Sequence, residues 1–196
     1  MKVVIVFHSV CGNVYLMARA FEGFLKSVGH EVDLYRVHDA DWVERPDLSE
    51  KAHETLCAMM ALPVVDPKVL ESADLILLGS PTYFGNVTAE MKAFMDSTGG
   101  LWFHGKLIGK KCAAFASAGN TEGGGDLCLQ AIHTYAKYMG MISMPVPVSL
   151  VPGENWPSLG IILYSNGKYA EVLDQRTEFA IKNHCAFLTK VAEPLK

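Results

Sequence analysis

The chain has 196 residues, of which 50% are hydrophobic and 19% charged, with a net charge of −4 at pH 7. These values predict a single α/β domain over residues 1–196 and argue against a nucleic-acid partner. No apolar stretch approaches the roughly 20 residues of a membrane span, so no membrane insertion is expected. The N-terminal apolar run is too short for a signal peptide, and the five cysteines lack paired or metal-like spacing. We therefore expect reduced thiols and a cytoplasmic location.

Hydrophobic periodicity predicts alternating strands and helices along the whole chain. The segment 38–65 is ambiguous and is expected to form a connector, with a possible helix over 49–61. The expected strands read as continuous apolar runs, which is typical of a parallel sheet buried on both faces. The strands are expected at 3–7, 30–37, 73–80, 111–117 and 141–148, and the helices at 13–28, 66–72, 88–98, 125–139 and 172–191.

The expected architecture is a doubly wound parallel sheet with helices on both faces. In such sheets, ligands bind outside the carboxyl ends of the strands, near the point where the strand order reverses. The loops that follow the first, third and fourth strands should therefore carry the functional residues.

The loop after the first strand is small, polar and glycine-containing, and it opens directly onto a helix. It directs backbone N–H groups and the positive end of a helix dipole at one spot, which suits a phosphate. The loop contains no lysine or arginine, so the backbone would supply most of the contacts. Its residues are Ser9, Val10, Cys11, Gly12, Asn13 and Val14.

The other two loops combine glycines, small polar residues and aromatic side chains. Together with the first loop they suit a mononucleotide with a large planar ring system, and FMN fits that description. Taken alone, each loop is equally compatible with a simple chain turn, so the prediction rests on all three together. The residues concerned are Pro81, Thr82, Tyr83, Phe84, Gly85 and Asn86 after the third strand, and Ser117, Ala118, Gly119, Asn120, Thr121, Gly123 and Gly124 after the fourth.

Several segments resemble the flavodoxin-like fold and, within it, the WrbA-type NAD(P)H:quinone oxidoreductases. The similarity extends over roughly residues 2–148 and is most specific from Gly79 to Trp102; Met17–Ala20 and Phe115–Gly125 also match. The resemblance implies a five-stranded sheet of order 2-1-3-4-5, bound FMN, NAD(P)H as electron donor, a quinone-like acceptor and a homodimer or homotetramer.

The resemblance also implies roles for individual residues. The first loop would wrap the FMN phosphate, and the other two loops would line the isoalloxazine ring. Trp102 and Met139 would contribute to a substrate pocket, with Trp102 reaching the pocket of a neighbouring subunit. The sequence departs from the family at Cys11, where a tyrosine that contacts the nicotinamide is usual. It departs again at Tyr138 and Met139, which stand where histidines are usual.

Three other functions compete with the reductase as interpretations of the sequence. An electron-carrying flavodoxin would be strongly acidic, and a net charge of −4 argues against it. A phosphatase with Cys11 as nucleophile needs an arginine about six residues later, where Met17 stands. An FMN-bearing interaction module stays open. No general acid is marked, since His104 and His133 are candidates by residue type only, and the role of residues 150–168 is also open.

Overall fold

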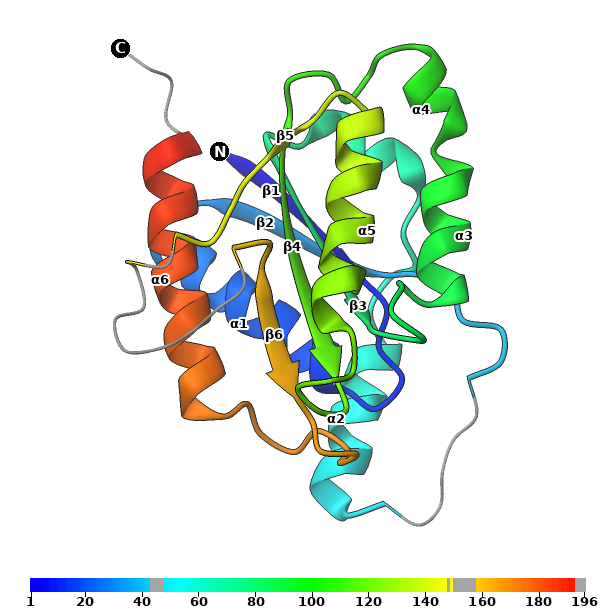
Figure 1. The fold of residues 1–196 in the computed structure, drawn as a ribbon, viewed down its shortest axis with the longest axis vertical. Coiled ribbons are helices and arrows are strands. Elements are labelled where there is room, and N and C mark those ends of the chain that lie inside the picture. Colours follow the sequence, from blue (N-terminus) through cyan, green and yellow to red (C-terminus); the bar gives the residue numbers. More distant parts are fainter. Residues whose placement is uncertain (43–47, 148, 150–157, 193–196) are drawn as a thin grey trace.

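A computed structural model describes the chain except for residues 43–47, 148, 150–157 and 193–196. Helices and strands alternate through most of its length (Figure 1). The strands are β1 (Lys2–Phe7), β2 (Glu31–Arg36), β3 (Leu75–Pro81), β4 (Lys111–Ala118), β5 (Ile142–Ser143) and β6 (Ile161–Tyr164). The helices are α1 (Asn13–Ser27), α2 (Glu50–Met60), the 3-10 helix η1 (Pro67–Ser72), α3 (Ala89–Ser97), α4 (Gly99–Phe103), α5 (Gly125–Tyr138) and α6 (Gln175–Ala192).

The sheet is parallel, with the strand order β2-β1-β3-β4-β5 and with β6 also paired to β4. The predicted order 2-1-3-4-5 is therefore confirmed. Because β1 and β3 are neighbours while β2 lies on the other side of β1, the strand order reverses beside β1. The reversal places the loops after β1 and β3 next to each other at one edge of the sheet.

Two short strands, β5 and β6, pair with β4 at the edge of the sheet where one long fifth strand was expected. The predicted strand 141–148 was wrong in extent, because β5 comprises only Ile142 and Ser143, which pair with the first residues of β4. Pro145 and Pro147 follow, and neither has an N–H to continue the ladder. The chain returns as β6, which pairs with Phe115–Ala118 at the other end of β4. The open segment 150–168 therefore contains a strand that sequence patterns did not predict.

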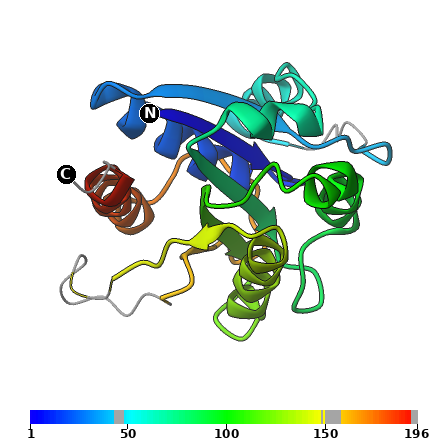
Figure 2. The ribbon, with the colours of Figure 1, turned by 90° about the horizontal axis from the view of Figure 1, so that it is seen from above.

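Alternate residues of the central strands supply two hydrophobic layers. On β1, Val3, Ile5 and Phe7 belong to the layer that packs against α1, α2 and α6. Val4 and Val6 belong to the opposite layer, which packs against α3, α4 and α5. Figure 2 shows helices on both faces of the sheet, as the doubly wound prediction requires.

Side-chain caps fix the first residues of two helices. Ser49 caps the ambiguous 49–61 segment by accepting a hydrogen bond from the Ala52 N–H, so that α2 forms there. Thr88 caps α3 in the same way through the Met91 N–H. Among the helices that the structure describes, none is both long enough and apolar enough to cross a membrane.

Candidate functional site

The loop between β1 and α1 forms a small backbone cradle. Gly12 adopts the left-handed conformation with φ of 80°, and a Cβ there would lie 3.0 Å from the Thr55 methyl group. Glycine is therefore favoured both by backbone conformation and by space. In the same loop the Ser9 hydroxyl is buried, and no described group hydrogen-bonds to it. A buried hydroxyl without a partner is costly, so this loop is built for a ligand that accepts its hydrogen.

The first turn of α1 faces the cradle with its N–H groups uncapped. Gly12 provides no side-chain cap, and the described first turn contains no acidic residue. Among the residues that the structure describes, those that line the cavity beside this loop include no lysine or arginine. Backbone N–H groups, the helix dipole and the Ser9 hydroxyl are thus the groups available to an anion, which fits a phosphate held without a charged side chain.

The loop after β3 is fixed at both ends by hydrogen bonds. The Ser80 hydroxyl oxygen accepts the Thr88 N–H at 3.1 Å. Between these residues, Tyr83 and Asn86 exchange two backbone hydrogen bonds of 2.9 and 3.1 Å, which close a tight turn. Phe84 stands fully exposed at the tip with φ of 51°. The turn therefore presents an aromatic ring to the outside of the chain.

The loops after β3 and β4 are joined directly. The Thr82 N–H donates to the Ser117 carbonyl at 2.8 Å, and the Thr82 hydroxyl donates to the Gly124 carbonyl at 3.1 Å. A Cβ on Gly124 would lie 3.1 Å from the Cα of Gly85, so the two backbones approach too closely for a side chain. This contact favours glycine at position 124, and a φ of 74° favours glycine at position 85.

A fourth loop, residues 165–170 after β6, completes the site and was missed by sequence reasoning. Its Ser165 and Asn166 N–H groups donate to the carbonyls of Ala118 and Gly119. At its other end, the Ala170 N–H donates to the Cys11 carbonyl at 2.8 Å. The Asn13 side chain donates to the Lys168 carbonyl at 2.9 Å. The fourth loop therefore joins the backbone cradle to the loop after β4.

Together the four loops enclose a cavity of about 130 Å³, referred to below as the cradle cavity. It brings together ten of the predicted residues and adds Ser165. Val14 is instead buried in the core, and Phe84 projects outward. The predicted residues that line the cavity are Ser9, Val10, Cys11, Asn13, Pro81, Thr82, Tyr83, Ser117, Ala118 and Gly119; those that do not are Gly12, Val14, Phe84, Gly85, Asn86, Asn120, Thr121, Gly123 and Gly124.

A signal for the fourth loop was present in the sequence. Ile161–Tyr164 is a short apolar run followed by Ser165, Asn166 and Gly167, the same pattern of strand and turn residues that marked the other loops. A short apolar run followed by turn residues therefore indicates a strand-end loop here, as it does at the other three positions.

The two predicted substrate-pocket residues lie away from the cradle cavity of their own chain. Trp102 belongs to α4, which Figure 1 shows at the end of the sheet opposite the carboxyl end of β4. Its side chain is 57% exposed. Met139 follows α5 at the same end and is buried, with its sulfur 4.0 Å from the Thr98 hydroxyl oxygen. Met139 therefore packs in the interior, whereas Trp102 is available to a neighbouring chain.

The candidate acid–base histidines serve structural roles here. His133 is buried, and its Nε2 donates to the Leu159 carbonyl at 2.6 Å, which holds the segment leading into β6. Burial lowers the pKa of His133. His104 packs edge-on against the Phe103 ring in the segment after α4. Neither histidine lines the cradle cavity.

The phosphatase alternative finds no support in the geometry. Arg19 is the arginine of α1 that follows Cys11, and its guanidinium donates to Glu22 at 2.6 Å. It is thus committed to a carboxylate one turn further along the helix. The cradle cavity lacks the cation that a cysteine phosphatase uses to clamp a phosphoryl group.

The sheet order and the four strand-end loops define a flavodoxin-like protein with a backbone cradle at the carboxyl end of β1. Residues 1–155 match the family described as NADPH-dependent FMN reductase, and the chain belongs to this family. The prediction of an FMN-dependent, NAD(P)H-using oxidoreductase class is thereby confirmed at the level of the family.

Curated relatives and solved structures agree with this assignment. The chain is 40% identical over 149 residues to a NAD(P)H dehydrogenase (quinone) of Chromohalobacter salexigens, covering 76% of this chain and 72% of that protein. A protein of the same name from Geobacter sulfurreducens is 38% identical over 150 residues, covering 75% and 72%.

Among solved structures, a WrbA-like flavodoxin from Agrobacterium tumefaciens aligns with a TM-score of 0.65 at 24% identity. That alignment covers 97% of this chain and 96% of that one. Flavodoxin 1 of Bacillus cereus aligns with a TM-score of 0.64 at 18% identity, covering 96% of this chain and 98% of that one. Both likenesses concern the fold, which they confirm as flavodoxin-like.

Proposed function

We propose that this protein is an FMN-dependent NAD(P)H:quinone oxidoreductase. The observation that carries the proposal is the cradle cavity, where an unpartnered buried Ser9 hydroxyl and the uncapped start of α1 meet without a charged side chain. The quinone dehydrogenases that share about 40% identity with this chain support the choice of acceptor. FMN held there would supply two-electron redox chemistry between NAD(P)H and a quinone, whose reduction to a hydroquinone uses the hydride of NAD(P)H and one proton from water.

The residues of the chain divide the work of binding. Ser9 and the N–H groups from Val10 to Val14 would hold the phosphate. Thr82 keeps the loops after β3 and β4 at a fixed separation through its bonds to Ser117 and Gly124. Tyr83 and Phe84 offer aromatic surface, 48% and fully exposed respectively, for a planar ring.

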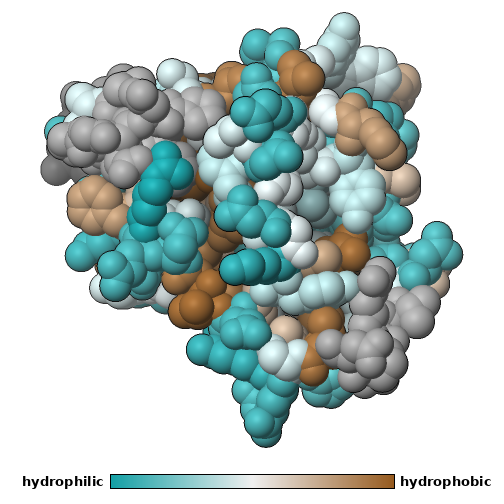
Figure 3. All heavy atoms as spheres, turned by 60° about the horizontal axis from the view of Figure 1, so that its bottom comes forward, coloured by the Kyte–Doolittle hydropathy of each residue, from teal (hydrophilic) through white to brown (hydrophobic). Residues whose placement is uncertain are grey.

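The face at the carboxyl ends of the strands can be followed in Figure 3, which brings the bottom of Figure 1 forward. There, small hydrophobic patches adjoin hydrophilic ones. A mixed surface of this kind suits a cofactor that has both an apolar ring and a charged phosphate.

We further propose that the active form is a homodimer or homotetramer. Trp102 and Phe103 are 57% and 77% exposed at the end of the molecule opposite the cradle cavity. Exposed aromatic residues are enriched in protein interfaces. A neighbouring chain would bring Trp102 to a cradle cavity that no residue of its own α4 reaches.

The test is to purify the protein, load it with FMN and mix it with NADH or NADPH and benzoquinone under anaerobic conditions. We expect a yellow protein whose flavin is bleached by the nicotinamide and recoloured by the quinone. A protein that takes up no FMN would contradict the whole assignment. A flavin that dithionite bleaches but neither nicotinamide does would favour an electron carrier.

A further inference from the structure

A second pocket of about 200 Å³ adjoins the cradle cavity on the side of β2, and Val10 and Tyr83 line both. This pocket is acidic. Asp39, Asp41 and Glu90 contribute to its lining, and the lining residues that the structure describes include no lysine or arginine. His8, the first residue after β1, also lines it. Three carboxylates with no cationic side chain among the lining residues favour a positively charged ligand.

The His8 ring is held in a fixed orientation. Its side chain is 3% exposed, and its Nε2 lies 3.2 Å from Asp39 Oδ2. Because a carboxylate only accepts hydrogen bonds, this contact assigns the hydrogen to Nε2. Asp39 is itself held, since its Oδ1 accepts the Asp41 N–H at 3.1 Å. In the neutral ring the lone pair is then on Nδ1.

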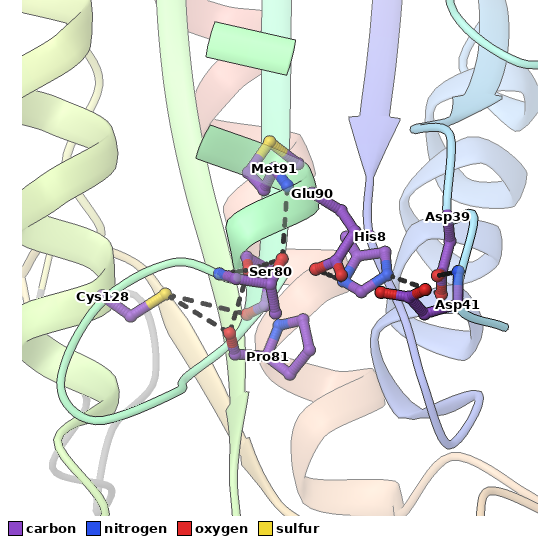
Figure 4. A network of polar contacts seen from close by, with 9 residues as sticks. His8, Asp39, Asp41, Ser80, Pro81, Glu90, Met91 and Cys128 are labelled. Carbon is purple, nitrogen blue, oxygen red and sulfur yellow. Dashed lines mark hydrogen bonds and ion pairs between the residues drawn. The ribbon is translucent and has the colours of Figure 1, made fainter. Parts of the chain in front are cut away.

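The lone pair on Nδ1 has no hydrogen-bond partner among the described residues, although the atom is buried. Glu90 Oε2 lies 3.7 Å from it, as Figure 4 illustrates. This separation is too long for a hydrogen bond. It is close to the separation of about 3.0 to 3.5 Å expected between two ligands that each lie about 2.1 Å from one ion. One ligand atom from each of His8, Asp39 and Glu90 lies within 4.8 Å of the other two.

We propose that His8 Nδ1 and the Glu90 carboxylate bind a divalent transition-metal ion in this pocket. Asp39 is the positioning residue, because a carboxylate on the second ring nitrogen fixes the tautomer and strengthens the ligating nitrogen. An imidazole with carboxylates suits ions such as Zn²⁺ or Co²⁺. The remaining coordination positions open onto the pocket, where water completes the shell. The proposal does not depend on the bound flavin.

The experiment titrates metal into the chelator-treated, FMN-loaded protein in a buffer without phosphate. His53 and Cys57, whose Nε2 and Sγ lie 3.4 Å apart on α2, form a competing pair of ligands. All measurements therefore use a background with His53→Gln and Cys57→Ser. Zn²⁺ is followed by calorimetry and Co²⁺ by its visible absorption. We expect one ion per chain, with the same stoichiometry in protein freed of FMN.

Substitutions then separate the roles of the residues. His8→Asn should abolish binding, and Glu90→Gln should weaken it by roughly tenfold or more. Asp39→Asn should weaken it by roughly 10- to 100-fold without changing the stoichiometry, as expected of a residue that acts through the ring. Asp96→Asn is the matched control, because Asp96 is an exposed carboxylate of α3 paired with Lys92, and it should change nothing.

Two results would overturn the proposal. One is that Zn²⁺ does not bind to the protein carrying only His53→Gln and Cys57→Ser, or that its affinity is unchanged by both His8→Asn and Glu90→Gln. The other is a ¹⁵N spectrum in which both ring nitrogens of His8 carry hydrogen after one equivalent of Zn²⁺ has been added. A hydrogen, and not a metal ion, would then lie between Nδ1 and Glu90. The Glu90 side chain is 27% exposed, so its variant should fold, which circular dichroism and retained FMN would verify.

Discussion

The loops after β1, β3 and β4 differ from the loop after β6 in how they contribute to the site. The first three have recognisable sequences: a small, polar, glycine-containing segment after β1, an aromatic turn after β3 and a run of glycines after β4. The fourth contributes mainly backbone hydrogen bonds, from Ser165 and Asn166 to the loop after β4 and from Ala170 to Cys11. The comparison teaches that the first three loops are recognisable from their residue types, whereas the fourth depends on where a strand returns to the sheet.

The largest expected effect is a loss of folding stability at acid pH, caused by a histidine of α6, the helix that follows the fourth loop. Burial lowers the pKa of His184 on α6 from its ordinary value of 6.5 to about 4. Between these values the unfolded chain binds more protons than the folded one. Stability present above pH 6.5 should therefore be lost as the pH falls toward 4, by about 3 kcal/mol.

His184→Leu should largely flatten this acid dependence in urea unfolding followed from pH 8 to pH 4. His133, whose pKa is also lowered by burial, contributes in the same direction and leaves a smaller residual slope. An unchanged slope in His184→Leu would show that α6 does not bury a neutral imidazole.

One added methyl group before β6 should disrupt the pairing of β6 with β4. A Cβ on Gly160 would lie 2.3 Å from the Ala114 carbonyl oxygen, which belongs to the backbone of β4 and cannot move aside. Gly160→Ala should destabilise the cofactor-free protein by about 2 to 3 kcal/mol in urea unfolding. Gly119→Ala, in the loop after β4, is the control because a Cβ there has no atom within 4 Å. Equal effects of the two changes would argue against the β4–β6 pairing.

The cradle should dominate the affinity for FMN. Ser9→Ala removes the buried unpartnered hydroxyl and should weaken FMN binding by about 1.5 to 3 kcal/mol, roughly ten- to a hundredfold. Ser165→Ala is the counterpart in the fourth loop, and its hydroxyl already donates to the Ala118 carbonyl at 3.3 Å. It should change the affinity no more than about threefold, or 0.7 kcal/mol. Fluorescence quenching of FMN measures both, and a reversed order would contradict the division of roles.

The smallest effect tests the link between the two regions. Asn13→Ala removes the hydrogen bond from its side chain to the Lys168 carbonyl. We expect a loss of about 1 kcal/mol in stability. Hydrogen exchange should accelerate at the N–H groups of Ser165, Asn166 and Ala170, with no change at those of Thr82 and Val87. Uniform protection in the variant would show that the fourth loop does not depend on the cradle.

Much of this architecture could be predicted because each strand of the sheet centre is an unbroken apolar run. Leu75–Leu78 and Val3–Phe7 are such runs, and each is followed at once by polar or glycine residues. The split of the fifth position was not predicted, since β5 has two residues and β6 only four. The turn residues after Ile161–Tyr164 are visible in the sequence, but strands this short leave no reliable period, and their pairing is decided by β4.

The candidate site, too, was predicted only where the sequence carries a local motif. Ser9 and Thr82 were expected because their loops carry visible motifs, whereas His8 was not among the predicted site residues. Its significance depends on Asp39 and Glu90, which lie 31 and 82 positions further along the chain. Periodicity and motif spacing do not report such contacts, which arise only when β2 and α3 fold beside β1.

The central claim is that these loops hold FMN for the transfer of electrons from a nicotinamide to a quinone. Stopped-flow absorbance of the FMN-loaded protein mixed with NADH or NADPH, and then with benzoquinone, tests it most directly. We predict loss of the oxidised flavin band after the first mixing and its full return after the second, with Ser9→Ala impaired at subsaturating FMN. A protein that binds FMN but whose flavin band is unchanged by both nicotinamides would contradict the claim.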